Sequence, residues 1–179
     1  MKKLFQFAIA TALFVSSLSS LRSQNPMQTP EVPKDHGLRI TDLAGVLLHT
    51  ETELLNRLSH KADSFDCVIQ VITEIKPAFW DGSLETLDYT LEISKKWGFN
   101  RRAIIVYIAL REKLSPNCDI KVQLSPSRDM AMYVPSTLCH SIIQQKMGPH
   151  LKKGNTRDIA KAISFGITEI TNEAKKQAQ

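Results

Sequence analysis

The sequence predicts an α/β fold, a single three-layer α/β/α sandwich around a mixed, mostly apolar central sheet of about four strands. Apolar runs of strand length alternate with segments of helical periodicity, which is typical of parallel strands joined by helices. A third run follows the second after a short polar turn, which indicates an antiparallel hairpin and therefore a mixed sheet. A content of 42% hydrophobic and 23% charged residues in 179 fits one globular domain.

The first predicted helix begins at a capping-box pattern, with Thr50 as N-cap and Glu53 three residues later. It runs to about Ser64, and its inner face is expected to carry Leu54, Leu58 and Ala62. The first clear strand follows at residues 67–75, CVIQVITEI. Because this run is β-branched and almost entirely apolar, the pattern predicts a strand covered on both faces.

The second predicted helix spans residues 83–98, from an Asp-Gly-Ser turn to Gly98. Its predicted inner stripe consists of Leu84, Leu87 and Leu91. Residues 103–110, AIIVYIAL, form the next predicted strand, and residues 119–124, DIKVQL, alternate as a half-exposed third strand of the hairpin.

Two closing helices complete the predicted domain. The first runs from Ser136 to about Met147 and stops before Pro149. The second starts near Asn155 or Thr156, with an inner face made of Ile159, Ala162, Ile163 and Ile167.

The chain ahead of this domain has the features of an export signal. Residues 1–23 combine Lys2 and Lys3, an apolar stretch and small residues near a cleavage site, as secretory signal peptides do. A retained anchor helix is the alternative, although Gln6 and several serines make the stretch weakly hydrophobic for a membrane span. Residues 24–37 are rich in proline and predict an extended linker. We therefore expect an exported protein, periplasmic or secreted, with its folded domain at residues 38–175.

Removal of the signal changes the charge argument. The whole chain carries 23 Lys and Arg against 18 Asp and Glu, a net charge of +5. Residues 1–23 contain Lys2, Lys3 and Arg22 and no acid, so 20 bases and 18 acids remain, a net charge of +2. A balance this even gives no support to nucleic-acid binding.

The sequence lacks the common signatures of catalysis and metal binding. It has no P-loop, no G-x-G-x-x-G and no G-x-S-x-G pattern, and its five histidines form no H-x-x-x-H pair. The three cysteines, Cys67, Cys118 and Cys139, form no C-x-x-C pair. Their placement favours burial as small hydrophobic residues, with one disulfide as the alternative.

Two stretches resemble a known family. LRITDLAGVLLHTETELLNRL is similar to the opening of TPM domains, V-x-D-x-A-G-x-L, through Asp42, Ala44, Gly45, Val46 and Leu47. DYTLEISKKWGF is similar to the E-Y-A…W-G-I-G segment of that family through Tyr89, Glu92, Trp97 and Gly98. The resemblance covers about residues 38–172. It implies an exported α/β/α domain and an association with phosphatase activity, with Ca²⁺ or Mg²⁺ binding and with the maintenance of membrane-protein complexes.

Three loops depart from the pattern of the family. Asn100, Arg101 and Arg102 stand where the family has D-N-G, residues 124–127 (LSPS) replace G-Y-G, and Ser136 stands in the T-D-A helix start. Ser136 keeps a hydroxyl for an N-cap but lacks the carboxylate that Ca²⁺ or Mg²⁺ prefers. Arg101 and Arg102 convert a potentially acidic rim into a basic one, which suits an anion or an acidic partner surface, or simply solvent.

Two acids in loops, Asp42 and Asp129, are further candidate residues of a binding site. Asp42 lies in the matched motif and is expected to bind local backbone N–H groups, with cation ligation as the alternative. Asp129 is expected to pair with Arg128 or to face solvent. No D-x-D or EF-hand spacing is present, so we predict no metal site and no cofactor, unless Ca²⁺ or Mg²⁺ binding is retained as the resemblance implies.

These observations favour a binding or accessory module of the cell envelope that is not catalytic. Its expected partner is an envelope or membrane-protein complex, and no motif identifies a small-molecule ligand. The alternative is a phosphatase of the TPM type that depends on a divalent cation. It is the less favoured interpretation, because such an enzyme needs two or more carboxylates converging on an ion.

Overall fold

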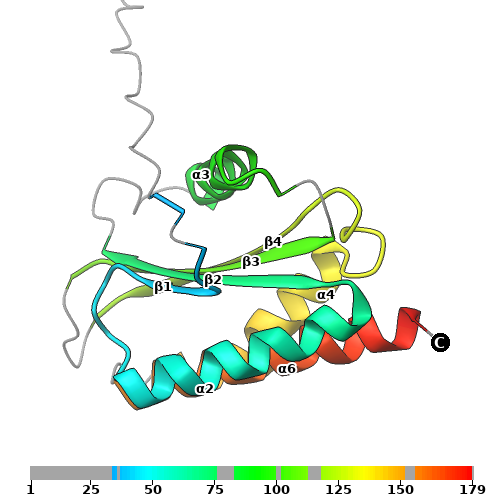
Figure 1. Cartoon of the computed structure of the whole chain (residues 1–179). Helices are drawn as coiled ribbons and strands as arrows, with labels where there is room; N and C mark the ends of the chain where they lie inside the picture. Colours follow the sequence, from blue (N-terminus) through cyan, green and yellow to red (C-terminus); the bar gives the residue numbers. More distant parts are fainter. Residues whose placement is uncertain are drawn as a thin grey trace, which may run out of the picture. The chain divides into compact units, whose positions relative to one another are not determined.

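Four strands form one mixed sheet in the order β1-β2-β3-β4 (Figure 1). The computed structural model describes residues 34–35, 37–75, 83–99, 102–112, 118–151 and 156–178. The strands are β1 (Ile40–Asp42), β2 (Val68–Ile75), β3 (Ala103–Leu110) and β4 (Ile120–Pro126). The first three are parallel, and β4 pairs with β3 in the antiparallel sense. The predicted α/β fold with a mixed sheet is therefore confirmed. The predicted signal peptide and most of the predicted linker lie outside the described residues.

Helices cover both faces of the sheet. Helix α3 (Ser83–Lys96) lies on one face, and α2 (His49–His60), α4 (Ser136–Ser141) and α6 (Thr156–Gln177) lie on the other (Figure 1). Shorter segments join them: a 3-10 turn at Lys61–Phe65, a π-helical segment at Ile142–Met147 and α5 (Gly148–Leu151). No helix in the described part of the chain is both long enough and apolar enough to cross a membrane.

The two parallel crossovers have opposite hands. The connection from β1 to β2 runs through α2 on one face, and the connection from β2 to β3 runs through α3 on the other (Figure 1). Both connections advance one position in the same direction across the sheet. One of them is therefore left-handed, which is rare among parallel crossovers. The change of face places a topological switch at the carboxyl ends of β1 and β2.

Strand β3 is the centre of the core, because all eight of its residues are buried. Ile104, Val106, Ile108 and Leu110 pack in the larger cluster with residues of α2, α4 and α6. Ile105, Tyr107 and Ala109 pack in a smaller cluster with residues of α3. Successive side chains of β3 therefore point to opposite faces of the sheet, and both faces are covered.

The predicted inner stripe of α3 is wrong. Leu87 and Leu91 are 37% and 42% exposed, and the side chain of Leu84 lies outside the described set. The buried side chains of α3 are Thr86, Tyr89, Thr90 and Ile93. The physical reason is that the sheet presents polar groups to this helix. A stripe of leucines facing them would leave buried hydrogen-bonding groups unpaired.

Three hydrogen bonds satisfy these polar groups. The Tyr89 and Tyr107 hydroxyls donate to one carboxylate oxygen of Glu74 on β2, over 2.9 and 3.0 Å. The hydroxyls of Thr90 and Ser125 on β4 lie 2.6 Å apart. The two tyrosine rings also meet edge to face, with centroids 5.6 Å apart. Helix α3 is thus held on the sheet by a polar network as well as by apolar packing.

Helix α2 starts two residues earlier than predicted, and Leu55 rather than Leu54 faces inward. Glu51, and not Glu53, closes the first turn, because it accepts a hydrogen bond from the N–H of Leu48 over 2.9 Å. Leu54 is 48% exposed, whereas Leu55 and Ser59 are buried. Ser59 is tolerated there because its hydroxyl donates to the carbonyl of Asn56 over 2.8 Å. Leu58 and Ala62 pack in the core as predicted.

The helix that begins at Ser136 passes the predicted stop at Met147. The chain continues through the π-helical segment into α5, which contains Pro149. A proline clashes with the carbonyl four residues earlier, and the wide π turn directly before Pro149 relieves that clash. The N-cap of α4 is Pro135, with no side-chain cap, so the predicted capping role of Ser136 is wrong.

Strand β1 is a short edge strand, and the cysteines lie mostly in the interior. The sequence pattern missed β1 because three residues carry no measurable periodicity. All three cysteines are free, with Cys67 and Cys139 buried and Cys118 half-buried. Burial raises the pKa of the Cys67 and Cys139 thiols to about 11.

We predict that Cys118 is the one thiol of the native protein that reacts quickly with Ellman's reagent at pH 8. With a pKa of about 11, only about 0.1% of each buried thiol is thiolate at that pH, and thiolate is the reactive form. The release of thionitrobenzoate should correspond to one thiol before denaturation and to three after it. Rapid labelling of a second thiol in the native state would contradict the burial of Cys67 and Cys139.

We also predict that the Glu74 network contributes to stability in a pH-dependent way. Burial first, and then the Glu74 carboxylate, raise the pKa of both phenols above the ordinary 10.0. Because the folded state keeps phenolic protons that the unfolded state releases, this stabilisation is complete below pH 10 and declines as pH rises further. Replacing either tyrosine with phenylalanine should cost about 1 kcal/mol at pH 7.

Urea unfolding of the wild type and of the double variant Tyr89→Phe/Tyr107→Phe, followed between pH 7 and 11, measures this effect. The difference between their unfolding free energies should shrink above pH 10. Lysines also titrate in this pH range, but they do so in both proteins. Their contribution therefore cancels in the difference between the two unfolding free energies, which leaves the contribution of the two phenols. A constant difference across this range would show that the two hydroxyls contribute no pH-dependent stability.

Candidate functional sites at the two ends of the sheet

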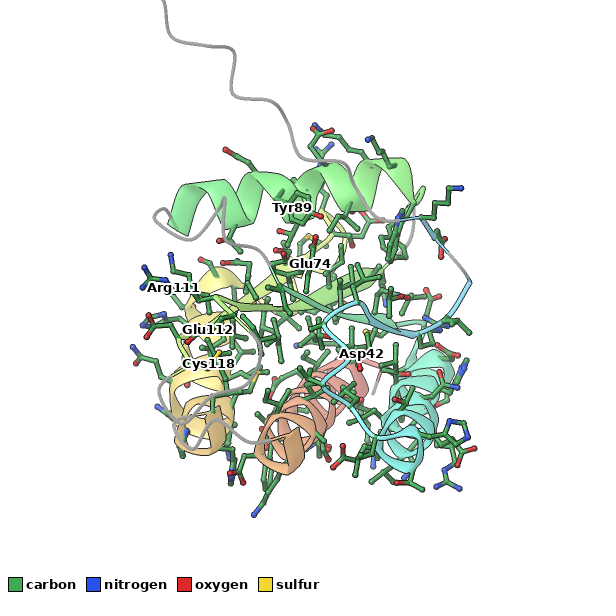
Figure 2. All side chains as sticks on the ribbon, turned by 90° about the vertical axis from the view of Figure 1, so that its left-hand side faces the viewer. Asp42, Glu74, Tyr89, Arg111, Glu112 and Cys118 are labelled. Carbon is green, nitrogen blue, oxygen red and sulfur yellow. The ribbon has the colours of Figure 1, made fainter. Side chains whose placement is uncertain are left out.

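The carboxyl ends of β1 and β2 are a candidate position for a ligand-binding site. Ligands of open α/β sheets bind where neighbouring connections leave toward opposite faces, and this fold has such a switch between β1 and β2. Asp42 is the last residue of β1, and Glu74 lies one residue before the end of β2. Figure 2 shows both acids, with Tyr89 of α3 directly above Glu74.

Asp42 closes the loop between β1 and α2. One of its carboxylate oxygens accepts from the N–H of Leu47 over 2.8 Å. The other accepts from the N–H of Val46 over 3.2 Å and from the hydroxyl of Thr73 on β2. Gly45, in the same loop, has a φ of +62°, a value that favours glycine. The expected local backbone role of Asp42 is therefore what the structure shows.

Glu74 is likewise engaged in holding the fold together. Its carboxylate accepts from the two buried phenols, and their raised pKa values keep both of them protonated as donors. A tyrosine that acts as a nucleophile or a general base would need a lowered pKa, which is the opposite of the shift found here. The arrangement anchors α3 and prepares no nucleophile.

The β3–β4 hairpin contributes further charges to this end of the molecule (Figure 2). Arg111 and Asp119 form an exposed ion pair of 3.3 Å. The Cys118 thiol lies 3.4 Å from the carbonyl oxygen of Glu112. Across the described ranges, no three His, Cys, Asp or Glu residues are grouped so that they could hold a metal ion.

The opposite end of the sheet carries Arg102, one residue before β3. Its guanidinium donates to the hydroxyl of Tyr133 over 2.6 Å and lies 4.4 Å from the centroid of that ring. Ser127 ties the neighbouring loop to the start of β3, because its N–H donates to the carbonyl of Ala103 over 2.7 Å and its hydroxyl accepts from the N–H of Ala103 over 3.1 Å. The chain therefore fixes the orientation of Arg102.

The three loops that depart from the family pattern meet at this end. Arg102 belongs to the first, Ser127 to the second, and Tyr133 precedes the helix start at Ser136. Asp129 and Ser136, in the segment after Ser127, are both exposed. Arg101 lies outside the described residues. We define the basic edge as Arg102 together with Tyr133.

Asp42 does not share a site with the other candidates. It bonds to Thr73, near the carboxyl end of β2, whereas Arg102 precedes the amino end of β3, which runs parallel to β2. The eight residues of β3 span about 25 Å, so the two candidates lie at opposite ends of the sheet. The carboxylate of Asp42 and that of Asp129 cannot converge on one ion.

A hollow of about 440 Å³ opens on the α3 side of the sheet, at the end where β2 and β3 begin. Its lining includes Arg39, Gln70, Phe99 and Ala103, the neighbour of Arg102. Arg39 forms a 2.8 Å ion pair with Asp63, and its second terminal nitrogen is buried without a hydrogen-bond partner among the described residues. This hollow places a second arginine, Arg39, at the same end of the sheet as the basic edge.

Sequence patterns missed several of these groups. Tyr133 lies in an irregular segment whose only signal was its aromatic residue, and its pairing with Arg102 spans 31 positions. Glu74 did offer a signal, since a lone acid in an apolar strand needs buried partners. The partners themselves, Tyr89 and Tyr107, become visible only once α3 is placed on the sheet.

Comparison with known proteins gives the family. No curated protein matches the chain. The solution NMR structure of the N-terminal domain of a protein from P. gingivalis superposes with a TM-score of 0.59, at 21% sequence identity, over 78% of this chain and 83% of that one. At that identity the likeness shows the fold alone. The model of the family described as TPM domain matches residues 40–173, three quarters of the chain. On that match, the chain belongs to the TPM domain family.

Proposed function

We propose that this TPM domain is an exported, non-catalytic binding module of the cell envelope, whose basic edge contacts an acidic surface of a membrane-protein complex. The observation that carries the proposal is the fixed guanidinium of Arg102, held by the ring and hydroxyl of Tyr133 at the meeting point of three loops. An arginine held by an aromatic ring loses little conformational freedom when it binds a carboxylate.

The positions of the acids and the charge of the basic edge speak against catalysis. A metal-assisted phosphatase needs convergent carboxylates, whereas Asp42 is engaged by a loop at one end of the sheet and Asp129 lies at the other. A guanidinium at the basic edge repels a divalent cation at short range. The same charge attracts carboxylate groups of a partner and speeds their association.

Export rests on the first 23 residues of the sequence, with their basic start and apolar stretch. A module delivered outside the membrane meets the exposed loops of membrane proteins. A net charge of +2 after removal of the signal is too small to drive binding by overall charge. Recognition would then depend on local groups such as Arg102.

We predict that millimolar Ca²⁺ or Mg²⁺ leaves the thermal midpoint unchanged relative to a chelator, because an ion bound to the folded state would raise it. Asp42→Ala should destabilise the protein by about 1–3 kcal/mol through loss of its loop hydrogen bonds, equally with and without the ions. The proposal fails if either ion raises the midpoint of the wild type but not that of Asp42→Ala. Hydrolysis of a phosphomonoester that both a chelator and Asp42→Ala abolish would establish the phosphatase alternative instead.

Crosslinking tests the partner. A photoreactive amino acid placed at Met132, which is 77% exposed beside Tyr133, should yield an adduct with a membrane protein in intact cells. Arg102→Glu should reduce the adduct at least about tenfold, since it replaces an attractive charge with a repulsive one. The same probe at Leu91, 42% exposed on α3, is the matched control and should give no such adduct. An adduct at Met132 that persists in Arg102→Glu would exclude the basic edge as the contact.

A further inference from the structure

A groove runs along the solvent side of the α2–α6 pair and holds two hollows. The first, of about 410 Å³, is lined by Glu51, Leu54 and Leu55 of α2 and by residues of α6 that include Lys161 and Phe165. The second, of about 220 Å³, is lined by Leu58 and Lys61 on one side and by α6 residues that include Thr168 and Asn172 on the other. Both hollows therefore lie between the same two segments.

The two hollows are related by a heptad. Each of the residues that line the second hollow lies seven positions after a residue that lines the first: Leu58 after Glu51, Lys61 after Leu54, Ile167 after Ala160, Thr168 after Lys161, Thr171 after Ser164 and Asn172 after Phe165. Positions rise together on both helices, so α2 and α6 run in the same direction (Figure 1). Seven residues of helix rise about 10.5 Å.

Repeating holes a heptad apart have the geometry of a coiled-coil seam. In such a seam each apolar side chain of one helix enters a hole formed by residues of the facing helices, and the next equivalent side chain follows seven positions later. The α2–α6 pair thus offers two consecutive holes to a third helix. A strand or an irregular loop has no side-chain repeat of that length.

The groove exposes large apolar side chains. Leu54 is 48% exposed and Phe165 is 39% exposed, although neighbouring Leu55 is buried. The Phe165 ring is stacked on His150, with centroids 4.9 Å apart and planes 9° apart, so its orientation is set before any partner binds. Preset aromatic anchors in a groove are typical of sites that bind helices.

Charges along the groove specify the occupant further. At the first hollow Glu51 stands on the α2 side and Lys161 on the α6 side. At the second hollow the α2 side carries Lys61 instead. A complementary helix would have a basic residue toward α2 at the first hollow and an acidic residue toward α2 one heptad later. This pattern also fixes the direction in which the helix lies.

We infer that the α2–α6 groove docks an amphipathic helix of a partner protein. The helix carries large apolar side chains at positions i and i+7, with a basic residue beside the first and an acidic residue beside the second on the edge that faces α2. Docking places the partner helix on the outer side of α2 and α6, away from the sheet. The groove is distinct from the basic edge, which lies at the start of β3, and the inference does not rest on the proposed contact of Arg102.

A designed peptide tests the inference. The probe is a fluorescent, alanine-rich helix of about three heptads with leucines at i and i+7 and with the stated charges. Its anisotropy is measured with protein expressed from the full-length chain. Leu54→Glu and Phe165→Glu should each weaken binding at least about tenfold. Leu91→Glu, at a comparably exposed leucine on α3, should leave binding unchanged.

A charge swap tests the direction. Lys61→Glu should weaken binding several-fold, and a second peptide whose acidic residue is replaced by lysine should recover it. Three results would overturn the inference: no binding of the peptide to the wild type, equal binding to wild type and Leu54→Glu, or sedimentation showing a wild-type dimer that Leu54→Glu dissociates. The last result would identify a second copy of the chain as the occupant. Far-ultraviolet circular dichroism of each variant confirms that it folds.

Discussion

The complete burial of β3 is the constraint on which the rest of the structure depends. A strand with all eight residues buried needs cover on both faces, so the chain must supply two helical layers. Three helices provide the larger layer, and α3 alone provides the other. Because buried hydroxyl groups lie between α3 and the sheet, the α3 layer relies on the shared acceptor Glu74 as well as on apolar packing. The larger layer aligns α2 beside α6, and the outer groove follows from that alignment.

The sequence predicts the sandwich and the strands β2, β3 and β4, because long buried runs have a local signal that tertiary contacts reinforce. It misjudges the inner faces of α2 and α3 for a common reason. Ser59 and Thr90 are buried although a pattern based on hydrophobicity favours leucines, because each hydroxyl has a hydrogen-bond partner: Ser59 bonds to the Asn56 carbonyl in its own helix, and Thr90 pairs with Ser125 on β4. The leucines displaced from those faces, Leu54 and Leu91, are exposed. The positions that the sequence pattern wrongly assigns to the core are therefore exposed apolar side chains.

The candidate site was less predictable than the fold. The backbone hydrogen bonds predicted for Asp42 are present, because an acid followed by a loop with glycine has local donors within reach. The sequence cannot tell that Asp42 and Arg102 lie at opposite ends of the sheet, since both flank strands and the separation depends on the parallel pairing of β2 with β3. Nor can it find Tyr133, whose contact with Arg102 depends on how the segment after β4 returns to the start of β3.

The motif that identifies the family and the loops that would carry an activity are different parts of this chain. Asp42 and Gly45 build the turn from β1 into α2, and Trp97 packs against the α3 cluster while Gly98, at a φ of +65°, ends the helix. These residues are required by the fold, so their presence establishes membership and says nothing about chemistry. The chain departs from the family pattern in the loops around Arg102, Ser127 and Ser136, at the other end of the sheet from Asp42. The charge of those loops, and not the family motif, is therefore the ground on which a function for this domain has to be argued.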